Sequence, residues 1–204
     1  MTQVNAFWNT RYKNTETYLF GEEPARGLVG MAGLLPERAE ILCVADGEGR
    51  NSVWLARQGH RVTGFDPAPV AVSRAQDLAT RHGVALETNV DGIDTWDWTR
   101  RFDVVAGIFI QFSPPDERQK VFAKMAGAVR PGGVILLHGF APRQVDYGTG
   151  GPGDPAHLYT IEMLRDAFAG WEVLNARDYD EEQSSGTGHS GMAALVDFVA
   201  KKPI

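Results

Sequence analysis

Two glycines and an acid mark the first strand–turn–helix unit that the sequence predicts. The turn reads DGEGRN (46–51), and Gly47 and Gly49 allow a sharp bend and a close approach of the backbone to a ligand. Asp66 stands 19 residues after Gly47, where the next strand ends. A carboxylate there can accept hydrogen bonds from the ribose hydroxyls of an adenosine. The combination favours an adenosine-bearing ligand over a structural turn in which Asp66 only caps the next helix.

The charge of the turn bears on which adenosine ligand it suits. Nicotinamide dinucleotides and methionine-derived sulfonium cofactors both carry adenosine, so Asp66 does not separate them. A pyrophosphate gains from a helix N-terminus that is free of negative charge, whereas Asp46 and Glu48 suit a cationic sulfonium with an ammonium group. Ser52 stands where a dinucleotide fingerprint has its third small residue. These residues favour the sulfonium, and an NAD-dependent oxidoreductase is the weaker alternative.

Strands and helices alternate along the first 140 residues, after which the character of the chain changes. Gly and Pro residues interrupt the segment 141–158, which is long for a passive loop. Asn51 and Ser52 are the candidate N-caps of the first helix of this alternation. Predicted strands cover 41–45, 60–66, 84–89, 102–112, 134–140, 171–179 and 192–201, and predicted helices cover about 52–58, 69–82, 114–130 and 160–169.

This alternation predicts an α/β fold with a doubly wound, mainly parallel seven-stranded sheet, because strands joined by helices cross over in a right-handed sense. The polar loop 180–191 joins the last two strands, which we expect to form an antiparallel hairpin. A ligand of such a sheet binds beyond the carboxyl ends of its central strands. We expect one domain over 1–204, with an N-terminal lid segment at 1–30, a cofactor-binding core at 38–140, and a substrate loop and C-terminal hairpin at 141–204.

Composition limits the partners and the compartment. The 204 residues carry a net charge of -6, which argues against a nucleic-acid backbone or an anionic membrane as the main partner. Cys43 is the single cysteine and lies in an apolar run, so we expect no disulfide and no nucleophilic thiol. The first residues lack a signal-peptide pattern, and no apolar run approaches the ~20 residues of a membrane span. We expect a cytoplasmic monomer or homodimer without a metal site, because the histidines lack metal-ligand spacing.

The motifs together resemble the class I S-adenosylmethionine-dependent methyltransferases over nearly the whole chain. The resemblance is closest to the small bacterial branch that includes tellurite-resistance and thiopurine-type methyltransferases. The matching segments are FWNTRY (7–12), YLFGEEP (18–24), VADGEGRNSVWLA (44–56), VTGFDPAPVAVSRAQ (62–76), FDVVAGIFIQF (102–112), AVRPGGVILLHGF (128–140) and GTGHSGMAALV (186–196). The branch commonly opens its first motif with LDLGCG, whereas Cys43, Ala45 and Asp46 replace its acid, glycine and cysteine here.

The resemblance implies S-adenosyl-L-methionine as the cofactor and S-adenosyl-L-homocysteine as the product. It places the turn at the methionine end of the cofactor and Asp91 at the adenine edge. The implied cofactor-binding residues are Ala45, Asp46, Gly47, Gly49, Arg50, Asn51, Asp66, Pro67, Val70, Asp91, Gly92, Ile93, Gly107 and Ile108.

For the methyl acceptor, the resemblance implies a small molecule, with a thiol, selenol or tellurite-type nucleophile as the candidates. We expect its pocket between the N-terminal segment, 141–158 and 181–191. Candidate substrate contacts are Trp8, Tyr12, Tyr18, Phe112 and Arg143, and candidate catalytic residues are Gln111, after the fourth strand, and His189, a general base in the late motif. We interpret His138 as the end of a strand and His157 as a loop or helix-entry residue.

A non-catalytic sensor of an adenosyl ligand is the alternative from another functional class, because the same fold supports it and a fold does not determine function. No D/N-P-P-Y/F tetrapeptide follows the fourth strand, so the sequence does not support amino methylation of nucleobases or glutamine. A covalent mechanism on cytosine has no candidate nucleophile, since Cys43 lies within a predicted strand.

Overall fold

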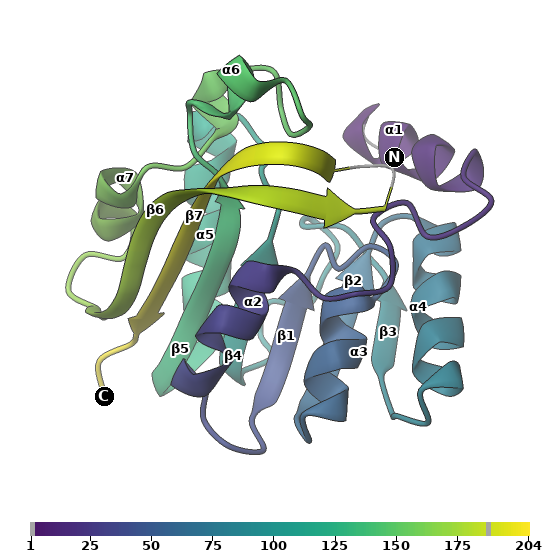
Figure 1. Cartoon of the computed structure of the whole chain (residues 1–204). Helices are drawn as coiled ribbons and strands as arrows, with labels where there is room; N and C mark the ends of the chain where they lie inside the picture. Colours follow the sequence, from purple (N-terminus) through teal and green to yellow (C-terminus); the bar gives the residue numbers. More distant parts are fainter. Residues whose placement is uncertain (1–2, 187–188) are drawn as a thin grey trace.

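The computed structural model describes residues 3–186 and 189–204, without the side chains of 3–6, 185 and 189, and contains a seven-stranded sheet (Figure 1). The strands are β1 (Glu40–Val44), β2 (Arg61–Asp66), β3 (Glu87–Val90), β4 (Phe102–Ile108), β5 (Val129–Phe140), β6 (Glu172–Ser185) and β7 (His189–Lys201), in the order β3-β2-β1-β4-β5-β7-β6. The first five run parallel, and β7 runs antiparallel to both β5 and β6. The predicted fold class is therefore confirmed.

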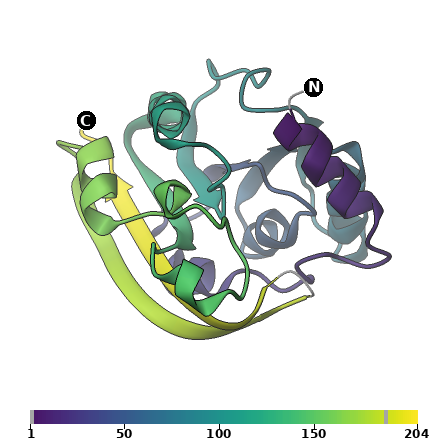
Figure 2. The same cartoon turned by 90° about the horizontal axis from the view of Figure 1, so that it is seen from above.

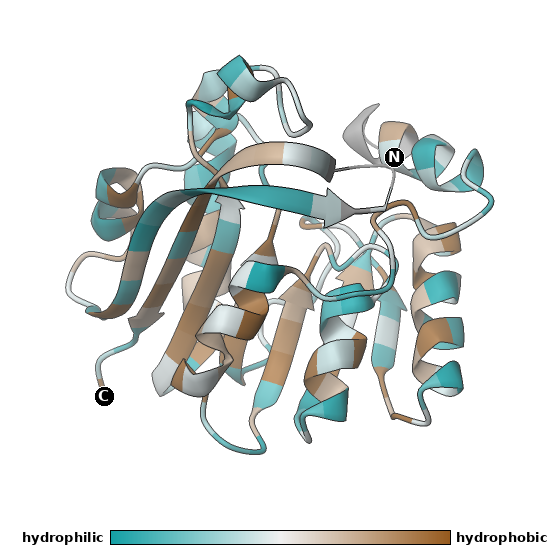
Figure 3. Cartoon of the chain, viewed as in Figure 1, coloured by the Kyte–Doolittle hydropathy of each residue, from teal (hydrophilic) through white to brown (hydrophobic). Residues whose placement is uncertain are grey.

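Helices cover both faces of this sheet. They are α1 (Gln3–Lys13), α2 (Arg26–Met31), α3 (Arg50–Arg57), α4 (Pro69–Arg81), α5 (Pro115–Ala128), α6 (Gln144–Tyr147) and α7 (Ile161–Ala167), with 3-10 turns η1 (Ala32–Leu34) and η2 (Pro155–His157). In β1, Ile41 and Cys43 pack with α2, α3 and α4, whereas Leu42 and Val44 pack with α5 and α7. Figure 3 shows the resulting apolar strands between the helices. In the described ranges, no helix has the length and apolar character needed to cross a bilayer.

The β6–β7 hairpin extends beyond the point that the sequence suggested. Of the segment 180–191, predicted as a loop, residues 180–185 continue β6 and residues 189–191 begin β7, with Asp180 paired to Ala194 and Ser185 paired to His189. That prediction was wrong because cross-strand backbone hydrogen bonds hold this part of the hairpin. Its polar side chains give no apolar alternation that a sequence pattern could detect. The extended hairpin reaches over the top of the sheet toward α1 (Figure 1).

The start of α3 also differs from the prediction. Gly49 is the N-cap, in the left-handed region at φ 84°, and no side chain caps the helix. Of the two predicted caps, Asn51 accepts a hydrogen bond from the Ala25 N–H through Oδ1 at 2.9 Å. Ser52 donates instead to a carboxylate oxygen of Asp46. Both side chains therefore connect α3 to other segments of the chain.

Two segments lie above the carboxyl ends of the parallel strands, as Figure 2 shows from above: α1 on one side and the segment 141–158 on the other. The turn at the tip of the hairpin packs beside them. A Cβ on Gly186 would lie 2.5 Å from the Leu19 carbonyl oxygen and 2.6 Å from the Gly21 nitrogen. Only glycine fits that contact, so the N-terminal segment and the hairpin tip pack backbone against backbone.

Candidate active site

A pocket of about 580 Å³ lies at the carboxyl ends of β1, β2 and β4. Its walls come from α1, from the turn that joins β1 to α3, and from the segment 141–158. Small-molecule sites typically enclose ~300–1,000 Å³. The pocket is therefore large enough for a nucleoside ligand, at the edge where a doubly wound sheet binds one.

The floor of this pocket is the turn between β1 and α3, which three residues shape by their backbone conformation. Ala45, Gly47 and Gly49 have positive φ values of 48°, 62° and 84°. The Asp46 N–H donates to the Phe65 carbonyl at 3.0 Å and so aligns the turn with the end of β2. A Cβ on Gly47 would lie 2.7 Å from Tyr12 Oη, which explains why this position holds glycine.

Asp66, at the end of β2, supports the turn from below and is 5% exposed. Its Oδ2 accepts a hydrogen bond from the Gly47 N–H at 3.0 Å, and its Oδ1 accepts one from the Ala68 N–H at 2.9 Å. A carboxylate has about four acceptor sites, so two remain after these bonds. Asp66 therefore holds the turn and can still receive hydroxyl groups from a ligand.

Burial raises the pKa of two carboxyl groups in this floor. The pKa of Asp46 rises to about 7, mainly through loss of solvent, and the hydrogen bond from Ser52 acts in the opposite direction. The pKa of Asp66 rises to about 6 for the same main reason, and its bonds from Ala68 and Gly47 oppose the rise. Both groups are thus costly to ionise without a cation nearby.

Glu48 connects the turn to the segment 14–21, which we call the strap. Its carboxylate accepts a hydrogen bond from the Leu19 N–H at 2.7 Å and pairs with Arg74 of α4 at 2.5 Å. Arg74 also donates to the carbonyl oxygens of Thr17 at 3.1 Å and Thr15 at 2.5 Å. The sequence suggested that Glu48 disfavours a pyrophosphate by its charge, but Arg74 pairs with that charge. Its contacts give Glu48 the role of anchoring the strap.

The strap carries α1 over the pocket as an aromatic cover. The Trp8 ring lies 5.9 Å from the Tyr12 ring and 6.2 Å from the Phe20 ring, between centroids. The Arg11 guanidinium stacks 5.3 Å from the centroid of Trp8. Tyr12 is 5% exposed, and burial raises its pKa well above the ordinary value. Figure 1 shows α1 joined to the core by this extended strap.

Not all the predicted cofactor-binding residues reach the pocket. Those that line it are Ala45, Asp46, Gly47, Arg50, Asn51, Asp66, Pro67, Ile93 and Ile108. Those outside the lining are Gly49, Val70, Asp91, Gly92 and Gly107. A Cβ on Gly49 would lie 2.6 Å from the Cβ of Ala75 in α4. Its lack of a side chain therefore serves the packing of the turn against α4, and its role toward a ligand stays a prediction.

The predicted acceptor residues divide in the same way. Trp8, Tyr12 and Phe112 line the pocket. Tyr18 lies outside the lining, and its Oη donates to the Arg74 carbonyl at 2.9 Å. Arg143 is also outside the lining, because it forms ion pairs with Asp178 and Asp180 of β6 at 2.5 and 2.7 Å. No residue from the extended hairpin is among the described residues of the lining.

The two predicted catalytic residues have different surroundings. Gln111 lines the pocket, but its Nε2 donates to the Phe140 carbonyl at 2.8 Å and its Oε1 accepts from the Phe140 N–H at 2.6 Å. These bonds favour a role in positioning Phe140 over direct catalysis. The backbone of His189 begins β7, while its side chain lies outside the part of the chain that the structure describes. Its role as a base stays a prediction.

Sequence reasoning passed over several lining residues, among them His157 and Phe109. His157 lines the pocket from the end of η2, although its position suggested only a loop or helix-entry residue. Phe109 lines it with a positive φ of 56° directly after β4. Their positions in the sequence were the available signal. Phe109 follows the carboxyl end of β4, and His157 belongs to the Gly/Pro-rich segment 141–158.

Comparisons with known proteins point to one family. A family described as methyltransferase domain matches residues 41–133. Thiopurine S-methyltransferase from Pseudomonas entomophila is 27% identical over 94% of this chain and 95% of its own. The chain is therefore similar to class I S-adenosylmethionine-dependent methyltransferases. S-adenosyl-L-methionine is the cofactor of the methyltransferases that it resembles.

Other relatives of this chain are longer proteins. Ubiquinone biosynthesis O-methyltransferase from Methylobacterium nodulans (strain LMG 21967 / CNCM I-2342 / ORS 2060) is 32% identical over 62% of this chain and 49% of its own length. Hemagglutinin 1 from Eikenella corrodens is 28% identical over 77% of this chain and 52% of its own length. This chain therefore spans about half of these two relatives. A solved protein studied for converting a disulfide bond into a thioacetal group during echinomycin biosynthesis shares the fold, with TM-score 0.80, 21% identity, and coverage of 98% and 93% of the two chains.

We predict that Ala45→Gly stabilises the protein. A non-glycine residue in the left-handed region costs roughly 1–2 kcal/mol, and the greater freedom of glycine in the unfolded chain offsets about 0.4–1 kcal/mol of the gain. Because Ala45 has a φ of 48°, we expect the melting temperature to rise by about 2–4 °C. Ala123→Gly, at an exposed position in the interior of α5, is the control and should lower stability by about 1 kcal/mol. Equal losses in the two variants would contradict the strain at Ala45.

We predict that ligand binding depends on pH through Asp46 and Asp66. In the ligand-free protein their raised pKa values contribute stability that is fully present below the unfolded pKa of ~3.9 and is lost as pH rises toward about 7. The α-ammonium of S-adenosylhomocysteine would favour their ionised forms. The increase in melting temperature on adding this ligand should therefore be larger at about pH 8 than at about pH 5.5. Asp46→Asn should flatten that difference, and a ligand effect that is independent of pH would count against it.

We predict that the Arg74–Glu48 pair keeps the strap ordered. Arg74→Ala leaves a buried carboxylate without its cation, and loss of a hydrogen bond to a charged group is worth about 1.5–3 kcal/mol. Hydrogen exchange at Leu19 should therefore accelerate by at least ~10-fold. Asp77→Ala is the matched control on the same helix, because its side chain is exposed. If both variants exchange alike, the strap is held by other contacts.

Proposed function

We propose that this chain transfers the methyl group of S-adenosyl-L-methionine to a small molecule held in the same pocket. The observation that carries the proposal is one continuous pocket with buried carboxylates at the β1 and β2 ends and aromatic residues toward 141–158. Asp66 would receive the ribose hydroxyls, and Asp46 would face the cationic methionine end. Pro67 and Ile93 offer apolar surface to a purine. The lining therefore suits the cofactor of the family.

The contribution of the chain would be alignment and exclusion of water. When bound, S-adenosylmethionine supplies a methyl group that its sulfonium has already activated. Alignment of two reactants can lower a barrier by several kcal/mol, up to roughly 7–11 in favourable cases. The turn would hold one reactant, while Trp8, Tyr12 and Phe20 of α1 and the strap would cover both. Hydrolysis and loss of alignment are thereby suppressed.

For the acceptor we propose a soft nucleophile, namely a thiol, selenol or tellurite-type species. The similarity to a thiopurine S-methyltransferase over nearly the whole of both chains supports this class. The apolar wall of Phe109, Phe112 and Phe140 supports an acceptor with apolar surface. A sensor that binds the adenosyl ligand without turnover is the rival function, and the two differ in whether bound ligand is consumed.

Calorimetric titration with S-adenosylmethionine, S-adenosylhomocysteine and NAD tests the cofactor. We expect the first two to bind and NAD to fail. Asp66→Asn keeps one backbone contact but loses charge-assisted bonds, so the dissociation constant of S-adenosylhomocysteine should rise ~10–100-fold. Asp166→Asn on the exposed face of α7 is the matched control and should bind as the wild type does. Unchanged affinity in folded Asp66→Asn would remove Asp66 from the binding site.

Turnover separates enzyme from sensor. Thiophenol, benzyl mercaptan, selenite and tellurite are offered with S-adenosylmethionine, and S-adenosylhomocysteine release is measured. Release that depends on an acceptor supports a methyltransferase. Tight binding of the cofactor with no release for any acceptor supports the sensor.

A further inference from the structure

The two ends of the pocket differ in chemistry. Asp46, Glu48 and Asp66 gather at the turn end, where each already has hydrogen-bond partners. The other end follows β4 and β5, where the rings of Phe109 and Phe140 lie 4.8 Å apart between centroids. A Cβ on Gly151 would lie 2.7 Å from Cδ2 of Phe140, so the loop packs directly on this aromatic wall. If the turn end holds the cofactor, the aromatic end is left for the acceptor.

His157 belongs to this aromatic end. Its side chain is half-buried and lines the pocket, as do Gly150, Gly151 and Pro152 of the same segment. Among the residues that the structure describes, none forms a hydrogen bond with its imidazole ring. A nitrogen of the ring is therefore available to a molecule in the pocket, and imidazole is the side chain that ordinarily exchanges a proton near neutral pH.

The backbone around His157 is held firmly. The Asp154 carboxylate accepts from the Ala156 N–H at 2.9 Å, and the Asp154 carbonyl accepts from the His157 N–H at 3.1 Å. Buried Arg118 of α5 donates to the Ala156 carbonyl at 2.7 Å. Asp154 and Arg118 are thus the charged residues that fix the turn, one from the same turn and one from the packed helix. The backbone of His157 is therefore fixed at the pocket, and a fixed attachment point helps to position a general base.

The segment that precedes His157 is fastened to β7. Gln144 accepts from the Ala194 N–H at 2.8 Å through Oε1, and its Nε2 donates to Thr149 Oγ1 at 2.9 Å and to the Gly150 carbonyl at 3.1 Å. Thr149 in turn donates to the Met192 carbonyl at 2.6 Å. In Figure 1 this segment rises above the C-terminal strands and stays beside them. The loop is therefore a built wall of the pocket.

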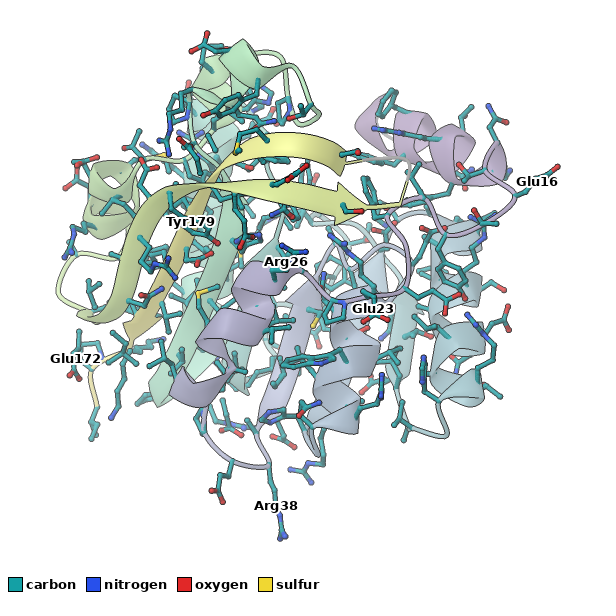
Figure 4. All side chains as sticks on the ribbon, viewed as in Figure 1. Glu16, Glu23, Arg26, Arg38, Glu172 and Tyr179 are labelled. Carbon is teal, nitrogen blue, oxygen red and sulfur yellow. The ribbon has the colours of Figure 1, made fainter. Side chains whose placement is uncertain are left out.

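Other candidate bases are less suitable. His138 is outside the pocket lining and fully buried, with Nδ1 2.7 Å from Oδ1 of Asp197. Tyr179 of β6, labelled in Figure 4, donates to the same carboxylate at 3.2 Å. The amide of Gln111 is bonded to Phe140. Of the titratable side chains described in the lining, His157 is the one contributed by the segment 141–158.

We infer that His157 is the proton acceptor for a methyl acceptor that arrives as a protonated thiol or hydroxyl, a role that rests on the proposed function. The acceptor's S–H or O–H bond breaks as its electron pair forms the new bond to the methyl carbon. The pair of the old carbon–sulfur bond returns to the sulfonium sulfur, and the proton ends on the imidazole. The inference narrows the substrate to acceptors that carry a removable proton.

A binding experiment tests the proton transfer without turnover. The probe is 4-nitrophenol, which ionises near neutral pH and absorbs visibly only as the phenolate. The probe is titrated into the S-adenosylhomocysteine complex at a pH well below its own midpoint, where only a small fraction of the free probe is ionised. In the wild type we expect the phenolate fraction of bound probe to rise at least several-fold above that of free probe, and in His157→Gln the rise should disappear.

Two comparator variants keep this test specific. His82→Gln changes an exposed histidine outside the pocket lining and should behave as the wild type does. His189→Gln examines the base that the sequence suggested. Failure of the probe to bind, an unchanged phenolate fraction in His157→Gln, or loss of the signal only in His189→Gln would each overturn the inference. Calorimetry with S-adenosylhomocysteine is read separately, so its failure would count against the proposed function.

Kinetics with two thiols gives an independent readout. Thiophenol is already largely ionised near neutral pH, whereas benzyl mercaptan is largely protonated. Removal of a positioned base typically lowers a rate ~10²–10⁴-fold. We expect His157→Gln to lower kcat for benzyl mercaptan by this order and to change kcat for thiophenol much less. Equal losses for both thiols, or a change in KM alone, would make His157 a contact residue and overturn its role as a base.

Discussion

The buried carboxylate of Glu48 is the contact on which the arrangement of this pocket depends. It receives the Leu19 N–H and the Arg74 guanidinium at once, so a single side chain in the turn fixes both the strap and α4. An unpaired carboxylate at this depth would be strongly unfavourable, and the chain cannot release the strap without exposing it or leaving it unpaired. The position of α1 above the pocket follows from that pairing.

The other two carboxylates of the turn link binding to stability. Asp66 is buried and Asp46 is half-buried, and loss of solvent raises the pKa of both carboxyl groups, so their negative charge is unfavourable in the folded protein. A cationic ligand would relieve that cost, so part of its binding free energy arises from groups that the fold holds under strain. Ala45, with its positive φ at the same turn, is a second source of strain. The residues that destabilise the turn, Ala45, Asp46 and Asp66, are therefore also residues of the proposed binding site.

The hydrophobic pattern was enough to predict a doubly wound, mainly parallel sheet, because β1, β4 and β5 are apolar runs buried on both faces. The glycine turn and Asp66 were recognisable because backbone geometry leaves few residue types for them. Contacts between residues far apart in the sequence were not recognisable. Nothing local in the sequence reveals that Gly49 faces Ala75, that Glu48 pairs with Arg74, or that polar strands extend the hairpin. His157 was missed because its importance comes from the loop that carries it over the pocket.

Different contacts hold the two ends of the pocket in place. The turn end is fixed by the sheet and by two buried carboxylates, Glu48 and Asp66, so substitutions there disturb the fold as well as the pocket. At the aromatic end, the side-chain amides of Gln111 and Gln144 form hydrogen bonds with backbone groups of Phe140, Gly150 and Ala194. Gln111 thereby connects the segment after β4 to β5, and Gln144, which belongs to the loop, connects the loop to β7. Gly151 cannot take a side chain without meeting Phe140, so the packing of the loop constrains its sequence at that point. Under the proposed function, acceptor choice belongs to this aromatic end and cofactor binding to the turn end.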